Sequence, residues 1–265
     1  MSKLMLARRI CIGLALTLLL ALAGWSFAIT PKALRKNLWR VVHYGCVVNQ
    51  RIFGVPAPCE KVDLKGGYVL VPSVGDAEEL LLVPTLRIGG IEDARLLDPQ
   101  IPNYWADAWT ERANLTVHAR PVPDDWVGLA VNSAQSRTQD QLHIHIDCIK
   151  SSTYDALRSS QIGSNWGMIE PLRGQHYWAR YVDAADFRSI SAFRIVAAAV
   201  GGSSQAMAHQ TIVAVSANGG VPGFYILHQA SNRVNRSFGV GEELLDHRCF
   251  GLFKSLRGSE KAGQR

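Results

Sequence analysis

Two histidines and an aspartate occupy every second position near the middle of the chain. Residues 142–149 read Leu-His-Ile-His-Ile-Asp-Cys-Ile, so that polar and apolar side chains alternate strictly. This alternation predicts a half-buried β-strand with His143, His145 and Asp147 on one face and the apolar side chains in the core. Side chains about 7 Å apart on a rigid strand suit nucleophilic catalysis, acid–base catalysis or metal binding. A solvent-facing strand that merely carries histidines is the alternative.

The segment that leads into this strand is rich in hydrogen-bonding groups. Residues 132–141 read Asn-Ser-Ala-Gln-Ser-Arg-Thr-Gln-Asp-Gln, without a bulky aliphatic side chain. A phosphate or an oxyanion beside a nucleophile needs donors of this kind, although an ordinary polar hairpin loop has the same composition. Next to the two histidines, the segment indicates a phosphate site.

The elements that must position these residues predict an α+β fold. In the first half we expect strands at 68–72, 79–84 and 127–132 and a helix at about 102–118. With the histidine strand this gives the order β-β-α-β-β with short links, which favours an antiparallel sheet with helices packed on it.

The second half repeats a similar outline without the histidines. We expect helices at 151–162, 184–200 and 242–246, strands at 176–182, 210–216 and 223–229, a hairpin turn at 218–220 and a frayed tail at 258–265. The β-α-β-β order of this half allows a degenerate internal duplication.

An uncharged apolar segment lies near the N-terminus. Residues 10–29 follow Lys3, Arg8 and Arg9, and twenty such residues can cross a bilayer as a helix. We predict a retained membrane anchor at 1–30 and export of the rest of the chain; cleavage after Ala23 is the alternative. Residues 31–63 then form a juxtamembrane, cysteine-containing linker, which could include a short helix that starts at Thr30.

The basic residues are concentrated beside this segment. The net charge is +6, from 28 basic and 22 acidic residues, and the first 40 residues hold seven basic and no acidic ones. The rest of the chain therefore has 21 basic and 22 acidic residues, a net charge of −1. The basic residues that raise the pI therefore lie in the anchor region, and the charge of the rest of the chain does not indicate nucleic-acid binding.

Four cysteines follow the apolar segment, an even number that suits an oxidising compartment. We predict a local Cys46–Cys59 bond and a long-range Cys148–Cys249 bond, although four cysteines permit three pairings and sequence alone does not choose among them. The lack of a Cys-x-x-Cys spacing argues against a structural zinc site. Cys148 faces away from the histidines, which argues against a catalytic Cys–His pair.

Several motifs resemble a known family. Asn132, Gln139 and the run His143-Ile-His145-Ile are similar to the signature of the histidine triad (HIT) superfamily of nucleotide hydrolases and transferases. Residues 81–88, Leu-Leu-Val-Pro-Thr-Leu-Arg-Ile, resemble its strand and proline turn. More specifically, the sequences at 56–59, 85–90, 137–146 and 246–249 look like those of the membrane-anchored CDP-diacylglycerol pyrophosphatases of Gram-negative bacteria.

The resemblance implies a mechanism. His145 is the expected nucleophile: it attacks the α-phosphorus of CDP-diacylglycerol, expels phosphatidate and forms a cytidylyl-histidine that water converts to CMP. Its other ring nitrogen is expected to be held by a backbone carbonyl. No metal or other cofactor is required. The residues expected to contact phosphate or to hold the loop are His143, Asn132, Gln139 and Gln141.

This sequence departs from the family pattern at two places. Asp147 stands where the third histidine is usual, and Arg87 stands where many relatives have a histidine after the proline turn. We expect Arg87 at the phosphate as a bidentate clamp. Asp147 is assigned to the same site, where it either orients a side chain or lies outside the residues that contact the phosphate directly. The acid that assists the leaving group is therefore unassigned. His247 is a further candidate, because the predicted Cys148–Cys249 bond brings it near the histidine strand.

The resemblance also implies the architecture and the location. We expect a HIT-like catalytic half at 64–150, a second α+β half at 151–265, and a single-pass inner-membrane protein whose catalytic domain lies in the periplasm. CDP-diacylglycerol and the lipid bilayer are the expected partners. A hydrolase or transferase for soluble nucleotides and a metal- or lipid-binding module are the alternatives. The other histidines, and Tyr104, Trp105 and Trp109, are expected to be surface or core residues.

Overall fold

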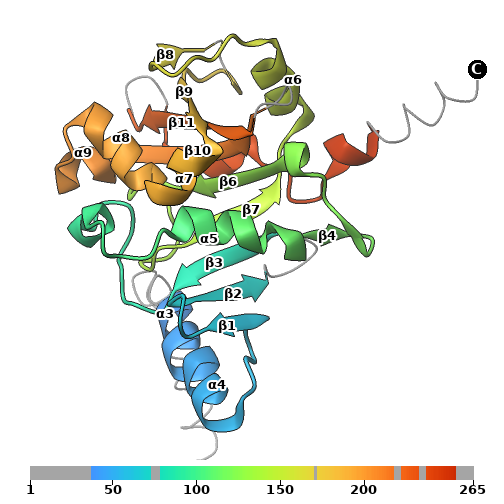
Figure 1. The fold of residues 1–265 in the computed structure, drawn as a ribbon, viewed down its shortest axis with the longest axis vertical. Helices are drawn as coiled ribbons and strands as arrows, with labels where there is room; N and C mark the ends of the chain where they lie inside the picture. Colours follow the sequence, from blue (N-terminus) through green and yellow to red (C-terminus); the bar gives the residue numbers. More distant parts are fainter. Residues whose placement is uncertain (1–36, 73–77, 170–171, 218–221, 233–236, 255–265) are drawn as a thin grey trace, which may run out of the picture. The chain divides into compact units, whose positions relative to one another are not determined.

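One large antiparallel sheet forms the centre of the fold (Figure 1). The computed structural model describes residues 37–72, 78–169, 172–217, 222–232 and 237–254, all within one compact unit, residues 35–265. The predicted anchor at 1–30, the hairpin turn at 218–220 and the tail at 258–265 lie outside these residues. Among the described residues, no helix has both the length and the apolar character needed to cross a membrane.

The nine strands of the sheet follow the order β1-β2-β3-β7-β6-β10-β11-β9-β8, and every neighbouring pair is antiparallel. Their bounds are β1 Lys61–Asp63, β2 Tyr68–Pro72, β3 Leu80–Pro84, β6 Val127–Val131, β7 Ile144–Cys148, β8 Gly167–Met168, β9 Trp178–Asp183, β10 Gln210–Ser216 and β11 Gly223–Ala230. A separate two-stranded ribbon joins β4 Thr116–Val117 to β5 Arg120–Pro121. The α+β class expected from the sequence is confirmed, whereas likeness to the HIT fold stays a prediction.

The helices flank the sheet. Their bounds are α3 Asn37–Arg40, η1 Val41–Cys46, α4 Val47–Phe53, α5 Tyr104–Glu111, α6 Ser151–Ser159, α7 Ala184–Ser189, α8 Ala192–Val200 and α9 Ser204–Ala208. Short 3-10 turns lie at η2 Ala94–Leu97, η3 Arg112–Asn114, η4 Asp124–Trp126 and η5 Gly241–Leu244.

Different helices pack on the two faces of the sheet. Directly opposed residues of neighbouring strands share a face, so that Ile146, Leu129 and Ala214 lie on the face packed against α5, α7 and α8. The opposite face carries His145 with its cross-strand neighbours Leu81 and Ala130. The continuous helix α3–η1–α4 packs over β2 and β3 on this second face, and η5 packs over β6 and β10.

The histidine strand is more buried than its sequence pattern predicts. Every residue from 141 to 149 is buried, including His143, His145 and Asp147, which are at most 7% exposed. A half-buried strand was therefore the wrong expectation. The alternation did predict the two faces, but a chain segment more than 90 residues away, around η5, covers the polar one.

Two predicted helices are shorter than the sequence suggests. The helix expected at 102–118 ends at Glu111 because the β-branched pair Thr116 and Val117 begins the ribbon, whose turn places His118 at a positive φ of 49°. The helix expected at 184–200 is divided in two, since Ile190 and Ser191 are extended and Ser191 is the N-cap of α8.

The strand order reads symmetrically outward from the β6–β10 pair. On one side follow β7 and β3, and on the other follow β11 and β9. An internal duplication would give this order, and duplication remains a prediction. Strands from both predicted halves, 64–150 and 151–265, belong to the same sheet; the division at residue 150 also remains a prediction.

Both predicted disulfide bonds are present. Cys46 is bonded to Cys59 over a sequence separation of 13, and Cys148 to Cys249 over a separation of 101. The first bond joins the end of η1 to the segment that follows α4, and the second attaches the C-terminal segment to the end of β7.

Candidate active site

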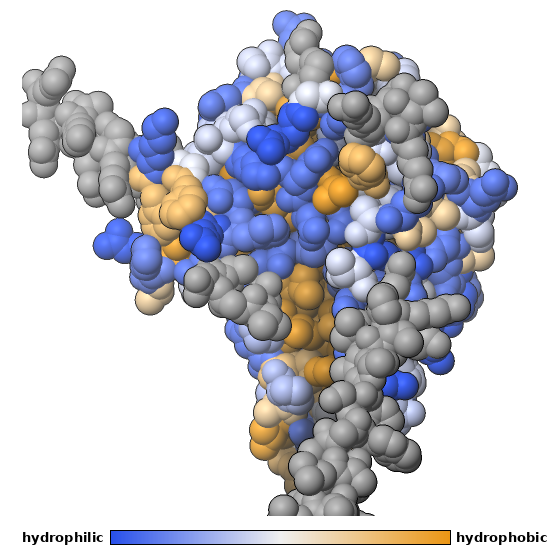
Figure 2. All heavy atoms as spheres, turned by 180° about the vertical axis from the view of Figure 1, so that it is seen from behind, coloured by the Kyte–Doolittle hydropathy of each residue, from blue (hydrophilic) through white to orange (hydrophobic). Residues whose placement is uncertain are grey.

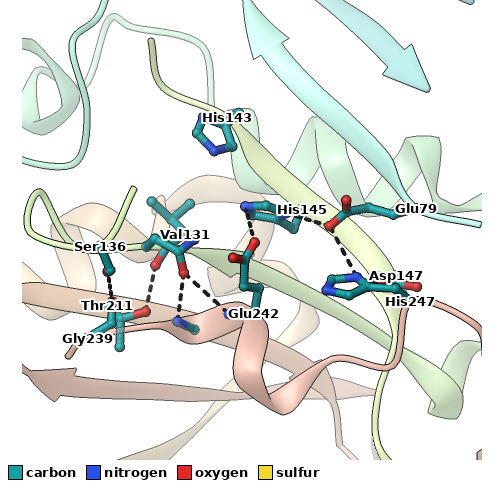
Figure 3. Close-up of polar contacts among 12 residues, drawn as sticks. Glu79, Val131, Ser136, His143, His145, Asp147, Thr211, Gly239, Glu242 and His247 are labelled. Carbon is teal, nitrogen blue, oxygen red and sulfur yellow. Dashed lines mark hydrogen bonds and ion pairs between the residues drawn. The ribbon is translucent and has the colours of Figure 1, made fainter. Parts of the chain in front are cut away.

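His145 lies in the centre of the polar face with a carboxylate on each side of its ring (Figure 3). Its Nδ1 atom lies 2.5 Å from Oε1 of Glu79, and both side chains are less than a tenth exposed. Glu79 directly precedes β3, two residues before Leu81, the cross-strand neighbour of His145. Because residues two apart on a strand share a face, the register of β3 against β7 brings this carboxylate to the ring.

The other nitrogen of His145 faces Glu242. Its Nε2 atom lies 3.1 Å from Oε2 of Glu242, an ion-pair distance, but without the alignment of a hydrogen bond. Nε2 is buried and the Glu242 side chain is 32% exposed, so this carboxylate lies between the ring and solvent. The arrangement holds Nδ1 by a hydrogen bond and leaves Nε2 without an aligned one.

The position of Glu242 depends on close packing of η5 against the sheet. Oδ1 of Asn132 accepts hydrogen bonds from the backbone N–H groups of Gly241 at 2.8 Å and Glu242 at 3.4 Å. A Cβ atom at Gly241 would lie 2.5 Å from Oγ1 of Thr211, so only glycine permits this approach. Asn132, expected to contact phosphate or to hold the loop, is therefore placed to hold η5.

A second histidine–carboxylate pair lies beside the first. Nδ1 of His247 is 2.7 Å from Oδ2 of Asp147 and 3.7 Å from Oε1 of Glu79. The hydrogen bond to Asp147 raises the pKa of His247 to about 8, so that His247 is a cation at neutral pH. Burial raises the pKa of Asp147, and the bond with His247 opposes that effect. The Cys148–Cys249 bond holds this pair together, because Cys148 follows Asp147 directly and Cys249 lies two residues after His247.

His143 is held differently from His145. Its Nδ1 atom donates to the backbone carbonyl of Gln141 at 2.7 Å, and its ring centroid is 5.0 Å from that of His145. Burial and the neighbouring His145 lower the pKa of His143 to about 4, so its ring is neutral. The backbone carbonyl expected at His145 is thus found at His143. That expectation was wrong because β3 supplies a carboxylate to His145 instead.

The two glutamines make contacts within the protein. Nε2 of the fully buried Gln141 donates to the carbonyls of Pro84 and Leu86, both at 2.9 Å, and so holds the turn after β3. Oε1 of Gln139 accepts from the backbone N–H of Leu38 at 3.2 Å, which connects the polar loop to α3.

Arg87 faces a pocket. Its guanidinium carbon lies 4.9 Å above the Trp39 ring, and a pocket of about 220 Å³ is lined by Arg87, Trp39, Arg40, Tyr44 and Asp140. The arginine of the polar loop, Arg137, instead makes a bidentate ion pair with Glu92 at 2.7 and 2.8 Å. Arg87 is therefore better placed than Arg137 to bind an external anion.

The surface of this face is divided in two. Figure 2 shows hydrophilic side chains gathered over the central part of the sheet and an apolar strip below them, toward the end that holds α4. Large apolar side chains of η1 and α4 are exposed to solvent, namely Tyr44 at 64%, Ile52 at 66% and Phe53 at 70%.

Two carboxylates of the site were missed by the sequence interpretation. Glu79 lies 66 residues before His145, and Glu242 lies 97 residues after it. For Glu79 a signal existed, because an acidic residue at the start of an otherwise apolar strand, on the same face as Leu81, has to have a buried partner. For Glu242 no spacing connects it to the motif.

Some of these side chains also have the spacing of cation ligands. Among the described residues, such groups are Glu79, His145 and Glu242, and Glu79, Asp147 and His247, whose ligand atoms lie within 4.8 Å of one another. In the second group His247 supplies a positive charge, and in the first His145 lies within ion-pair distance of both glutamates. Acidic groups around an imidazole are an arrangement that can transfer protons.

The sequence is similar to known proteins. A family model described as CDP-diacylglycerol pyrophosphatase matches residues 33–252. A curated protein of Yersinia pestis named CDP-diacylglycerol pyrophosphatase is 31% identical over 216 residues, which cover 80% of this chain and 83% of that protein. The matched region includes β7, both disulfide bonds and every carboxylate described above.

Proposed function

The chain belongs to the CDP-diacylglycerol pyrophosphatase family, and on that premise we propose that it hydrolyses CDP-diacylglycerol to CMP and phosphatidate with His145 as a covalent nucleophile. The observation that carries the proposal is the buried imidazole of His145, held at Nδ1 by Glu79 with Nε2 directed toward the partly exposed Glu242. An imidazole with one nitrogen fixed presents the other in a single orientation.

In the proposed reaction, Nε2 of His145 attacks the α-phosphorus of the cytidylyl group. The bond to the phosphatidate oxygen breaks, and a cytidylyl-histidine remains until water releases CMP. The Glu79 carboxylate stabilises the cationic ring that the adduct contains, as a buried carboxylate does for a histidine in other covalent enzymes. We expect this chemistry to proceed without a metal ion.

Other residues are proposed to hold the substrate. Arg87 would bind a phosphate oxygen from its pocket, since arginine remains charged and donates two parallel hydrogen bonds. The neutral His143, adjacent to His145, would donate or accept at the phosphate after a small shift. Gln139, Gln141 and Asn132 would act by holding the loop and η5, and Asp147 by orienting His247.

We also propose that the enzyme works at a membrane. The uncharged residues 10–29 would anchor the chain in the bacterial inner membrane, and the two disulfide bonds support an oxidising, periplasmic-like environment for the rest. The exposed apolar side chains of Tyr44, Ile52 and Phe53 would meet the lipid surface from which the substrate is taken.

Trapping the intermediate tests the proposal. The enzyme, mixed with CDP-diacylglycerol labelled in the cytidylyl phosphate and quenched in alkali, is expected to carry an acid-labile label on His145. The His145→Ala variant should carry none. Label on His143 would transfer the nucleophilic role to that residue. Faster turnover of dinucleoside polyphosphates than of CDP-diacylglycerol would favour a soluble-nucleotide hydrolase, and loss of activity in EDTA would favour a metal site.

A further inference from the structure

The proposed reaction needs a group that transfers protons at the phosphorus. Where the family pattern has its third histidine, this chain has Asp147, whose side chain is fully buried and bonded to His247 and to the backbone of Cys148. Asp147 therefore cannot reach a leaving oxygen. Glu79 is held at Nδ1, on the side of the ring away from the reactive nitrogen.

Glu242 differs from both of these carboxylates. Its Oε2 atom lies 3.1 Å from Nε2, the atom that must bond to phosphorus, and its side chain is 32% exposed, whereas that of Glu79 is 8% exposed. Nε2 itself is buried and has no aligned hydrogen bond. A buried polar atom of this kind indicates a functional contact that the resting protein does not complete.

The backbone of Glu242 is fixed although its carboxylate is accessible. Asn132 accepts from the N–H groups of Gly241 and Glu242, and Leu245 donates to the carbonyl of Glu242. The carboxylate can therefore move only by rotation of its own side chain, the movement that it would need to reach an oxygen on the far side of an incoming phosphorus. In-line displacement places the leaving oxygen on that line of attack.

We propose that Glu242 is the general acid and base of the reaction, an inference that rests on His145 acting as the nucleophile. As phosphate enters, the proton on Nε2 passes to the Glu242 carboxylate. The Nε2 lone pair then bonds to phosphorus, the bond to the phosphatidate oxygen breaks, and its electron pair receives the proton from Glu242.

The second step reverses these roles. The Glu242 carboxylate takes a proton from water, the water oxygen bonds to phosphorus, and the electron pair of the breaking phosphorus–nitrogen bond returns to Nε2. Glu242 then returns the proton to Nε2, which restores the resting pair. The balance is one water consumed for each CMP and phosphatidate formed.

The matched control is the next residue in the chain. Glu243 lies on the same 3-10 turn and is also acidic, but its carboxylate accepts from the Tyr177 hydroxyl at 3.1 Å, away from His145. Glu242→Gln and Glu243→Gln therefore remove one negative charge each from adjacent positions. Only the first change alters the group beside Nε2.

The experiment uses aryl esters of CMP whose phenols range from dinitrophenol to phenol, with full-length enzyme in detergent. For Glu242→Gln we expect turnover of the phenyl ester to fall by about 10²–10⁴-fold, the usual contribution of a positioned acid. The dinitrophenyl ester, which needs no acid, should give a burst of dinitrophenol followed by slow release of CMP. Glu243→Gln should behave as the wild type.

Three results would count against the role of Glu242. The first is that turnover by Glu242→Gln depends on the acidity of the leaving phenol as it does in the wild type. The second is that the dinitrophenyl ester gives no burst of dinitrophenol. The third is that Glu243→Gln loses as much turnover as Glu242→Gln. If Glu242→Gln proves unfolded in a thermal melt, Glu242→Asp replaces it. Because aspartate keeps the carboxyl group, turnover should fall but should depend only weakly on the acidity of the leaving phenol. Dinitrophenol release without label on His145 would refute the nucleophile proposal separately, because the leaving-group dependence still reports on Glu242.

Discussion

Two strands at equivalent places in the sheet each carry a buried histidine, and the two histidines have different neighbours. His145 lies on β7 and His228 on β11, the strands on either side of the central β6–β10 pair, and both are at most 7% exposed. His145 has a carboxylate at each ring nitrogen. His228 contacts the side-chain oxygen of Gln210 at 3.0 Å and the Trp166 ring at 4.7 Å.

The difference shows what burial alone does to a histidine. At His228, burial lowers the pKa to about 4, which leaves a neutral ring that acts as a core residue. At His145, the buried carboxylate of Glu79 and the partly exposed carboxylate of Glu242 lie within ion-pair distance of the ring. A histidine on a strand therefore becomes a catalytic candidate through its acidic neighbours, and the predictions below test that contrast.

Removing the imidazole of His145 should have the largest effect. We expect His145→Ala to lose on the order of 10⁴-fold or more in kcat, since the covalent route needs that nitrogen. Initial rates with CDP-diacylglycerol in mixed micelles measure the loss, and circular dichroism tests the fold.

His228→Ala is the matched variant and should show the opposite pattern. Its Tm should fall by about 5 °C because a buried side chain is lost from the core, while kcat changes by less than about three-fold. Comparable losses of kcat in both variants would remove the contrast between the two strands.

The next largest effect should come from the carboxylate at Nδ1. Glu79→Gln keeps a hydrogen-bonding oxygen beside His145 but removes the charge that stabilises the cationic ring. We expect kcat to fall by about 10²–10⁴-fold with little change in KM, as for other carboxylates behind a catalytic histidine. Steady-state kinetics separate the two constants. A rise in KM at constant kcat would show that Glu79 binds substrate and does not position the ring.

The sequence predicted those parts of the fold that depend on local pattern. Alternation at 142–149 identified the histidine strand and its two faces because a strand has a period of two residues. Val, Ile and Leu runs also located β2, β3, β10 and β11 closely. Helix ends were less accurate, because helical spacing around Trp105 and Trp109 did not reveal that the ribbon beginning at Thr116 would end the helix early.

The site itself could be predicted only in part. The motif provided His143 and His145, but Glu79 and Glu242 reach the ring through strand register and through the packing of η5, which no spacing in the sequence encodes. Gln141 and Asn132 were expected to contact phosphate or to hold the loop, and in this structure both bind backbone groups. Their amides satisfy buried donors and acceptors that a sequence does not display.

Breaking the long-range disulfide bond should affect both stability and chemistry. The Cys148–Cys249 bond attaches the segment that carries Glu242 and His247, so we expect Cys148→Ala/Cys249→Ala to lose about ten-fold in kcat as well as stability. Chain-entropy arguments assign about 4.7 kcal/mol to a loop of 100 residues and about 3 kcal/mol to a short one. Denaturant unfolding and initial rates measure the two losses.

The local bond serves as the control. Cys46→Ala/Cys59→Ala removes a bond of sequence separation 13 beside α4, away from the histidine pair. It should lower the free energy of unfolding and leave kcat in a soluble-substrate assay within about two-fold. Equal losses of kcat in the two double variants would mean that the C-terminal segment needs no covalent attachment to hold Glu242.

The smallest effect should be the pH dependence of stability that His247 contributes. Its pKa is about 8 in the folded protein and about 6.5 when unfolded. Below about pH 6.5 His247 is protonated in the folded and in the unfolded protein, and its full contribution to the free energy of unfolding is present. That contribution is lost as the pH rises through 8. Because His247 is 43% exposed, the pair with Asp147 is worth no more than about 1 kcal/mol, or a Tm change of about 2–4 °C. Melting curves from pH 6 to 9 should diverge between wild type and His247→Gln at low pH and converge above pH 8. If the Tm of the two proteins instead changed with pH in parallel, the proton on His247 would not be needed to stabilise the buried carboxylate of Asp147.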